Sequence, residues 1–410
     1  MSPTLALYLV TFGALLLVAV LLDDIADRIR VPGILLVLLL GLLTDNDINP
    51  LSSGGDGPHL LSLQHANEIA QIALVLLLFF GGLTTNWSQL RDVLKPALRL
   101  ATVGALITAV LITAVVMVLG SLPITERTPT LPVALFVGAM VCSTDSSAVL
   151  ALLRPLADRL PRRVIDLLEC ESGFNDPVAV VLAGVAMAMA LGDQTTTASS
   201  LVVDASRQFM IGVLLGFLGG SLASQLLSLQ RKFTSPPLQA VVSLAVLFLL
   251  VGLTQLLGGS GILAAFVAGL VLGNGSQWDR DVLEQAHAGF AKMAELMLFL
   301  CLGLVVQGEK VVDILLWVVV LFLVMVVARW LMVEMMLMKS GFSRPEHVLI
   351  AASGLRGAVP VAVAIQAAAS DVPWGKEMPP LALGVVLLGL FVQGFSLVPL
   401  ARRLGLASSE

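Results

Sequence analysis

One aspartate, Asp145, lies halfway along the apolar run VGAMVCSTDSSAVLALL at residues 137–153. Hydroxyl side chains occupy the two positions before it and the two positions after it. Where a helix is interrupted inside a membrane, carboxylate, hydroxyl and freed carbonyl oxygens can bind Na⁺ or K⁺. The alternative is a helix break in which the same polar side chains only cap one another. A cap does not require burial at membrane depth, so the sequence favours a cation site.

A second polar cluster, CESGFNDPVA at residues 170–179, directly precedes a long apolar stretch. Residues four apart lie on one face of a helix, so Ser172 and Asp176 share a face. Glu171 and Asn175 form a second pair four residues apart, on the adjacent face of the same helix. Charged side chains within a membrane are rare and usually face a cavity or a partner, so both carboxylates are candidate functional groups.

A proline, Pro177, interrupts the hydrogen bonding of this segment. It cannot donate to the carbonyl oxygen of Gly173, which leaves that oxygen free for water or a cation beside Asp176. The alternative makes Asp176 an N-terminal cap with the proline at the first helical position. However, Asp166 and two preceding arginines mark an earlier helix start. Ten residues of helix would place Asp176 roughly 15 Å from that start, at about 1.5 Å per residue.

A third cluster, SGLRGAVPVAVA at residues 353–364, places Arg356 between two glycines inside another apolar run. Pro360 cannot bond back to the carbonyl of Arg356, so the sequence predicts an interrupted helix there. A buried guanidinium needs a carboxylate partner. We predict that Glu171 is this partner, since a bidentate pair would leave Asp176 free. The alternative is that Arg356 pairs with Asp145 and only holds the helices together.

The composition indicates where such clusters must lie. Of 410 residues, 58% are hydrophobic and 12% are charged, against about a quarter charged in ordinary soluble domains. The net charge of −5 does not indicate a nucleic-acid partner. The three cysteines have no disulfide or zinc spacing. We therefore predict an all-α polytopic protein of the lipid bilayer that is not an enzyme.

Apolar runs approaching the ~20 residues of a spanning helix give thirteen candidate spans. Their approximate bounds are residues 5–24, 31–48, 65–84, 95–120, 132–153, 164–190, 206–229, 237–256, 261–273, 283–308, 311–338, 347–370 and 380–401. Lys and Arg gather in one set of alternate loops, whereas the other set holds only Arg127, Arg207, Lys310 and Lys376. Cytoplasmic loops carry the basic excess, which places the N-terminus outside and the C-terminus in the cytoplasm.

The two predicted helix breaks fall in the fifth and twelfth spans, seven spans apart. Matched breaks at corresponding positions are typical of inverted repeats in transporters. We predict repeats formed by spans 1–6, about residues 5–190, and spans 8–13, about residues 237–401. Span 7, about residues 206–229, would link them. Residues 1–410 would then form a single transmembrane transporter unit with no C-terminal regulatory domain.

Lys292, Glu295 and Arg329 also lie within the predicted spans. Lys292 and Glu295 are three residues apart in the tenth span and are expected to form an ion pair. The alternative is that Lys292 acts directly as the counter-charge to a transported ion. Arg329 lies in the eleventh span, where it is expected to extend toward the inner membrane surface.

The motifs STDSSAVLALL, ESGFNDPVAVVL and SGLRGAVPVAVA occur in this order. Together they resemble the monovalent cation/proton antiporters of the NhaP/NHE branch, over about residues 30–400. The resemblance implies thirteen membrane helices, divided into a dimerisation domain and a mobile core, in a plasma-membrane homodimer. It implies electroneutral exchange of one Na⁺ or K⁺ for one H⁺ in pH homeostasis, with no cofactor besides the transported ions.

The resemblance also implies roles for individual residues. Asp176 would be the main cation and proton carboxylate. Asp145, the backbone of Thr144 and Ser172 would be further ligands of Na⁺ or K⁺. Asn175 would position the site, and Glu171 would pair with Arg356. Some relatives have an acidic ligand in the third span, but no acidic residue follows Glu68 there. A water could complete the coordination.

Three other classes of function remain open from the residues. A cation-coupled symporter of an organic anion can use the same crossed-helix design, but it requires a larger polar cavity. An intramembrane aspartyl protease also needs two aspartates, but its Tyr-Asp and Gly-x-Gly-Asp signatures are absent. A passive channel is disfavoured by carboxylates placed to hold an ion. The residue types do not distinguish Na⁺ from K⁺.

Overall fold

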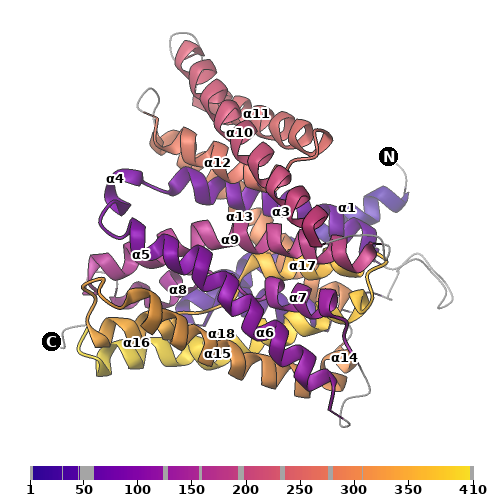
Figure 1. Ribbon diagram of the computed structural model, residues 1–410. Coiled ribbons are helices and arrows are strands. Elements are labelled where there is room, and N and C mark those ends of the chain that lie inside the picture. Colours follow the sequence, from indigo (N-terminus) through magenta and orange to yellow (C-terminus); the bar gives the residue numbers. More distant parts are fainter. Residues whose placement is uncertain are drawn as a thin grey trace.

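The chain folds into a bundle of helices that cross one another at a range of angles (Figure 1). The computed structural model describes residues 3–29, 31–44, 46, 60–122, 128–156, 159–192, 198–230, 236–275, 280–306 and 308–406. Within these ranges all regular secondary structure is helical.

In chain order the helices are α1 (Pro3–Ile29), α2 (Gly33–Leu43), α3 (Leu63–Thr84), α4 (Trp87–Leu90), α5 (Leu94–Arg99), α6 (Ala105–Gly120), α7 (Leu131–Met140), α8 (Ser146–Leu153), α9 (Arg162–Leu191), α10 (Ala198–Gln230), α11 (Pro236–Leu256), α12 (Gly261–Gly273), α13 (Arg280–Val305), α14 (Gly308–Asp313), α15 (Leu315–Leu337), α16 (Arg344–Ala352), α17 (Ala358–Ala368) and α18 (Met378–Arg403).

The membrane-crossing segments agree with the predicted spans. Nine helical segments in the described ranges are long and apolar enough to cross a membrane. The four other predicted spans correspond to α2, α12 and two pairs of shorter helices, α7 with α8 and α16 with α17. The all-α polytopic fold with two interrupted helices is therefore confirmed.

One predicted span contains a feature that the sequence did not indicate. Between α5 and α6 the chain forms a π-helical turn, Leu100–Gly104. The turn leaves the apolar composition unchanged, so a hydropathy pattern does not detect it. π-Helical turns inside helices are frequent at functional sites, and this one packs against α9 and α15.

The helices pack as two groups. The scaffold group contains α1, α2, α3, α10, α11, α12 and α13, and the site group contains α5 to α9 and α15 to α18. Figure 1 shows α10, α11 and α12 above, and α6, α15 and α16 below. Three helices of the site group lie at the boundary: α9 contacts α3, α10 and α12, α17 contacts α3 and α13, and α18 contacts α13.

Within the scaffold group, glycines allow α3 and α12 to approach closely. A Cβ atom on Gly82 would lie 2.2 Å from the carbonyl oxygen of Phe266, and one on Gly269 would lie 2.2 Å from that of Phe79. Small residues at such contacts are typical of helix packing in membranes. This packing fixes the position of α3, which forms part of the boundary with the site group.

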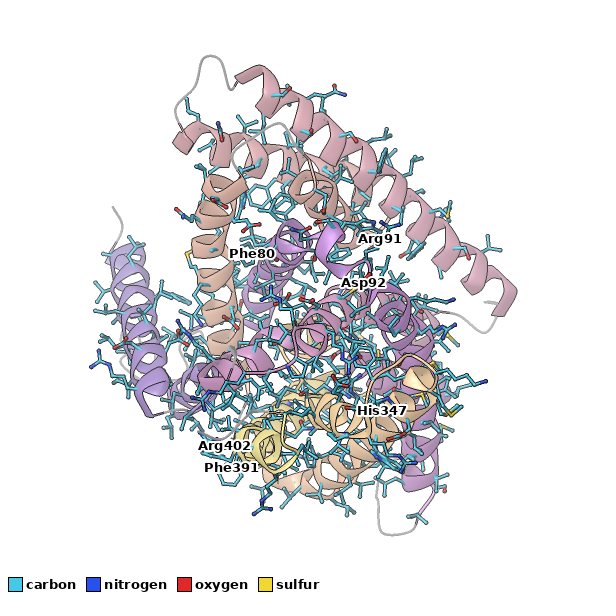
Figure 2. All side chains as sticks on the ribbon, turned by 90° about the vertical axis from the view of Figure 1, so that its left-hand side faces the viewer. Phe80, Arg91, Asp92, His347, Phe391 and Arg402 are labelled. Atoms are coloured by element: carbon cyan, nitrogen blue, oxygen red, sulfur yellow. The ribbon has the colours of Figure 1, made fainter. Side chains whose placement is uncertain are left out.

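The first and the last helix of the chain have their outer ends at opposite ends of the bundle. In Figure 1, α1 begins at the right-hand end and α18 finishes at the left-hand end. Figure 2 looks onto the left-hand face of that view and labels Arg91, His347 and Arg402 there. Opposite ends are the expected result of an odd number of crossings.

Candidate functional site

The two interrupted helices meet at their breaks. The first break separates α7 from α8 at residues 141–145, and the second separates α16 from α17 at residues 353–357. The backbone N–H of Asp145 donates to the carbonyl oxygen of Leu355 at 2.9 Å. Irregular backbone at membrane depth must find hydrogen-bond partners within the protein. Here each break supplies a partner for the other.

Asp145 has a different environment at each carboxylate oxygen. Oδ1 accepts hydrogen bonds from the backbone N–H groups of Ser147 at 2.8 Å and Ala148 at 3.2 Å, and from the Ser147 hydroxyl at 2.6 Å. Asp145 is thus the N-cap of α8. Oδ2 faces Gly357, where a Cβ atom would lie 1.9 Å away. The capping interpretation therefore applies to Oδ1, whereas Oδ2 takes no part in the cap of α8.

Replacement of Gly357 by alanine is expected to displace the Asp145 carboxylate. The added Cβ would also lie 2.5 Å from Cγ and 2.6 Å from Cβ of Asp145. Overpacking of this kind costs about 1–3 kcal/mol. Thermal unfolding of the purified protein should show the loss. Gly173→Ala is the matched control, because its nearest new contact would be 3.6 Å. Equal unfolding temperatures for the two variants would contradict this account.

Asp176 lies in the middle of α9, with Pro177 inside the same helix. It is therefore not an N-terminal cap. Its side chain is partly exposed, and it lines the large cavity described below. Asp145 lines the same cavity. The break between α7 and α8 thus contributes a second carboxylate to the cavity that contains Asp176.

Two further residues of α9 hold the break in place. The Ser172 hydroxyl donates to the carbonyl oxygen of Thr144 at 2.9 Å and accepts from the Ser146 N–H at 3.1 Å. The Asn175 side-chain amide donates to the Thr144 hydroxyl at 2.8 Å. The structure thus brings Thr144, Ser172 and Asn175 together with the two aspartates.

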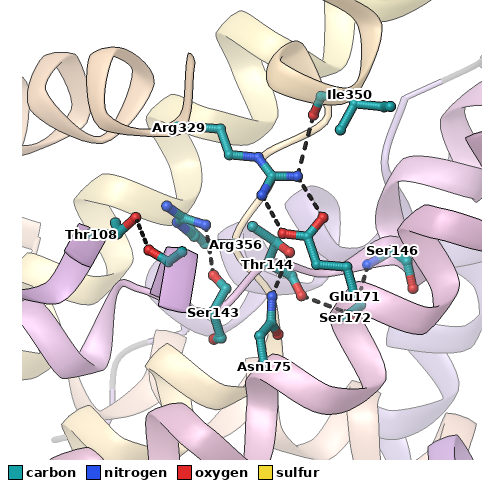
Figure 3. A network of polar contacts seen from close by, with 11 residues as sticks. Thr108, Ser143, Thr144, Ser146, Glu171, Ser172, Asn175, Arg329, Ile350 and Arg356 are labelled. Carbon is teal, nitrogen blue, oxygen red and sulfur yellow. Dashed lines mark hydrogen bonds and ion pairs between the residues drawn. The ribbon is translucent and has the colours of Figure 1, made fainter. Parts of the chain in front are cut away.

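The predicted ion pair between Glu171 and Arg356 is wrong. Glu171 instead forms a bidentate pair with Arg329 of α15, in which Nη1 bonds to Oε1 and Nη2 bonds to Oε2 at 2.8 Å (Figure 3). Arg329 Nη2 also donates to the carbonyl oxygen of Ile350 at 3.3 Å. Glu171 is 1% exposed and Arg329 is 6% exposed, so this is a buried salt bridge.

The expectation that Arg329 extends to the membrane surface is also wrong. The residue lies eight positions before Leu337, the last residue of α15, and this is too deep for the side chain to reach the helix end. An arginine about two helical turns inside an apolar helix was the signal in the sequence that could have identified it.

Arg356 is 3% exposed and donates through Nη1 to the carbonyl oxygen of Ser143 at 2.7 Å. Arg356 therefore provides a hydrogen-bond donor for a backbone carbonyl group of the first break. Among the residues that the structure describes, three buried polar atoms of this region have no hydrogen-bond partner: Arg356 Nε, Arg329 Nε and Asn175 Oδ1. All three side chains line a cavity of about 10 Å³. That volume is close to the minimum for one water molecule.

A larger cavity of about 340 Å³ is lined by Asp145 and Asp176 and by residues at the end of α3. Its walls come from both helix groups, and the polar side chains that line it include Thr84, Asn86, Asp145, Glu169, Asp176 and Glu295. Thr84 and Glu169 are exposed. Thr84 lies at the end of α3, next to the loop with Arg91, which Figure 2 labels on the facing end.

The predicted pair of Lys292 and Glu295 is present at 3.2 Å. Lys292 also binds Asp23 of α1 at 3.0 Å. Its ammonium group is therefore held by two carboxylates of the scaffold group, which does not favour Lys292 as a counter-charge at Asp176.

Comparison with known proteins supports the resemblance of this chain to monovalent cation/proton antiporters. A family model described as "Sodium/hydrogen exchanger, transmembrane" matches residues 13–403. The chain is 34% identical over 397 residues to the K(+)/H(+) antiporter NhaP2 of Shewanella sp. (strain MR-4), covering 95% of this chain and 66% of that protein. It is 32% identical over 403 residues to the K(+)/H(+) antiporter NhaP of Alkalimonas amylolytica, covering 98% and 67%.

A further relative, the Na(+)/H(+) antiporter ApNhaP of Aphanothece halophytica, is 28% identical over 352 residues, covering 82% of this chain and 65% of that protein. The chain thus spans about two thirds of the length of these curated relatives. The sodium proton antiporter MjNhaP1 from Methanocaldococcus jannaschii has the same fold, with a TM-score of 0.81 at 23% identity over 98% of this chain and 99% of that one. By the extent of the family match, this chain belongs to the sodium/hydrogen exchanger family.

Proposed function

We propose that this protein exchanges a monovalent cation, Na⁺ or K⁺, for H⁺ by competition at Asp176. The observation that carries the proposal is the position of this carboxylate, at the crossing of two broken helices and on the wall of an open cavity. An ionised carboxylate in low-dielectric surroundings is costly without a bound positive charge. Asp176 therefore holds either a proton or a cation, and the two ions exclude each other.

The proposed cation ligands are the oxygens around this carboxylate. Asp176 and Asp145 supply carboxylate oxygens, and Ser172 supplies a hydroxyl. The carbonyl of Thr144 accepts one hydrogen bond from Ser172 and retains a second lone pair. Asn175 holds the Thr144 side chain and so positions the break. Hard oxygen ligands at interrupted helices are the usual way to bind alkali cations in transporters.

The balance of charge among the groups that would move together favours an electroneutral exchange. Within the site group, three carboxylates, Asp145, Glu171 and Asp176, accompany two guanidinium groups, Arg329 and Arg356. With all five ionised, these groups carry one net negative charge. One proton or one monovalent cation neutralises it, whereas two would leave an uncompensated positive charge. Because burying an unpaired charge is costly, one-for-one exchange is favoured.

For transport, the site group is proposed to move against the scaffold group and expose Asp176 to each side in turn. In the proposed orientation, which the distribution of basic loop residues supports, the C-terminal end of α18 lies in the cytoplasm and the start of α1 lies outside. The cavity would then open to the cytoplasm. The scaffold group would provide the contact between two copies in a homodimer of the plasma membrane.

The test is cation-driven proton movement in proteoliposomes that contain a pH-sensitive dye. K⁺ is added first, since the two relatives of higher identity are named K(+)/H(+) antiporters, followed by Na⁺, Li⁺ and choline. The expected result is proton efflux driven by K⁺ or Na⁺ and not by choline. For cations other than K⁺, a valinomycin clamp of the membrane potential should leave the rate unchanged.

If no inorganic cation moved protons, antiport at Asp176 would be excluded. The next candidate would then be a cation-coupled symporter of an organic anion, tested by uptake of that anion. A rate that changed with the clamp would exclude only the electroneutral stoichiometry and leave cation/proton exchange in place.

A further inference from the structure

Glu295 brings a carboxylate of the scaffold group into the cavity that contains the proposed site. It lies on α13, whereas Asp145 and Asp176 belong to the site group. All three side chains line the same cavity. A negative charge on one helix group thus faces negative charges on the other.

The position of this carboxylate is fixed by a three-residue cluster. Lys292 Nζ lies 3.2 Å from Oε2 of Glu295, and it lies 3.0 Å from Oδ2 and 3.1 Å from Oδ1 of Asp23. One ammonium group therefore serves two carboxylates, and the cluster keeps one net negative charge. Its members come from α1 and α13, so this charge does not move with the site group.

We propose that Glu295 is a coupling residue, a fixed charge that opposes movement of the site while Asp176 is ionised and empty. This inference rests on the proposed antiport and assigns Glu295 no role as a ligand. When a proton or cation occupies Asp176, the moving group carries one negative charge fewer. Repulsion between like charges is stronger across protein of low dielectric constant than in bulk water. The loaded site therefore passes Glu295 more easily than the empty one.

This repulsion is expected to suppress a leak, namely the movement of cations without exchange for protons. If the empty, ionised site could return, the protein would carry cations downhill without protons. Glu295→Gln removes the fixed charge and is expected to raise this uncoupled flux about tenfold, which corresponds to about 1.4 kcal/mol of barrier. Cation-driven proton exchange should persist in the same variant, because its proposed ligands are intact.

The leak is measured as efflux of ⁸⁶Rb⁺ or ²²Na⁺ from proteoliposomes into cation-free medium. The pH is alkaline on both sides, which limits proton return, and thiocyanate is the permeant anion that compensates charge. Proton exchange is measured on the same preparations with the internal dye. Monodispersity in detergent shows that each variant is folded.

Three other variants sharpen the test. Asp23→Asn leaves Lys292 to neutralise Glu295 alone, so the leak should rise although the cavity wall is unchanged. Glu295→Asp keeps the charge and should keep the leak low. Glu169→Gln removes a cavity carboxylate that belongs to α9 and moves with the site, and it should leave the leak at the wild-type level.

Increased leak in Glu295→Gln and Asp23→Asn, but not in Glu169→Gln, would support the inference. An unchanged leak in both of the first two variants would overturn it. So would loss of proton exchange in folded Glu295→Gln, since that would make Glu295 part of the binding site. If the wild type itself moves no protons in response to cations, it is the proposed function that fails.

Discussion

Replacement of Asp176 by asparagine is expected to abolish cation/proton exchange and leave the protein folded. The amide has nearly the same shape, but it cannot release a proton at physiological pH and offers a cation no charge. The initial rate of cation-driven proton efflux should fall to that of protein-free liposomes. Elution in detergent should remain monodisperse, because the carboxylate forms no ion pair within the described residues.

The matched control is Asp166→Asn on the same helix. Asp166 lies near the start of α9, where it pairs with Arg162 at 3.2 Å. The Arg162 side chain is 74% exposed, so the pair contributes about 0–1 kcal/mol at most. Exchange should therefore persist in this variant. A folded Asp176→Asn variant that still exchanged cations for protons would refute competition at Asp176.

Replacement of Arg329 by methionine should cause the largest loss of stability among single substitutions at the site. It would leave Glu171 buried without a positive partner, and breaking a buried ion pair in this way costs about 3–5 kcal/mol. Thermal unfolding in detergent measures the loss. Glu171→Gln combined with Arg329→Met should recover part of it, because no unpaired carboxylate then remains.

Arg356→Met is the comparison that tests the corrected pairing. Arg356 donates to a backbone carbonyl, that of Ser143, so its removal leaves one unsatisfied neutral group. That costs about 1–3 kcal/mol. The variant should therefore be more stable than Arg329→Met. The reverse order would restore Arg356 as the main partner of Glu171.

The sequence predicted the segments and their breaks because these follow from local composition. Apolar length indicated the spans, and the hydroxyl cluster around Asp145 and the glycines around Arg356 indicated the interruptions. The short ninth span corresponds to α12, Gly261–Gly273, as expected from its run of apolar and small residues.

The sequence did not predict which guanidinium faces which carboxylate. That choice depends on how α15 is rotated and how deeply it sits against α9, and neither is encoded in a single segment. Arg356 has more obvious motif neighbours, but Arg329 is the residue whose side chain reaches Glu171. Likewise, the sequence showed that Glu295 pairs with Lys292, but not that it lines the same cavity as Asp176.

The contact between the two breaks has an evolutionary consequence. The hydrogen bond from Asp145 to Leu355 joins main-chain atoms, so no substitution at either position, except proline at 145, removes its donor or its acceptor. Mutations can therefore alter the oxygen ligands nearby and leave the crossing itself intact. The framework of the crossing and the ligand side chains around it can therefore change independently during evolution.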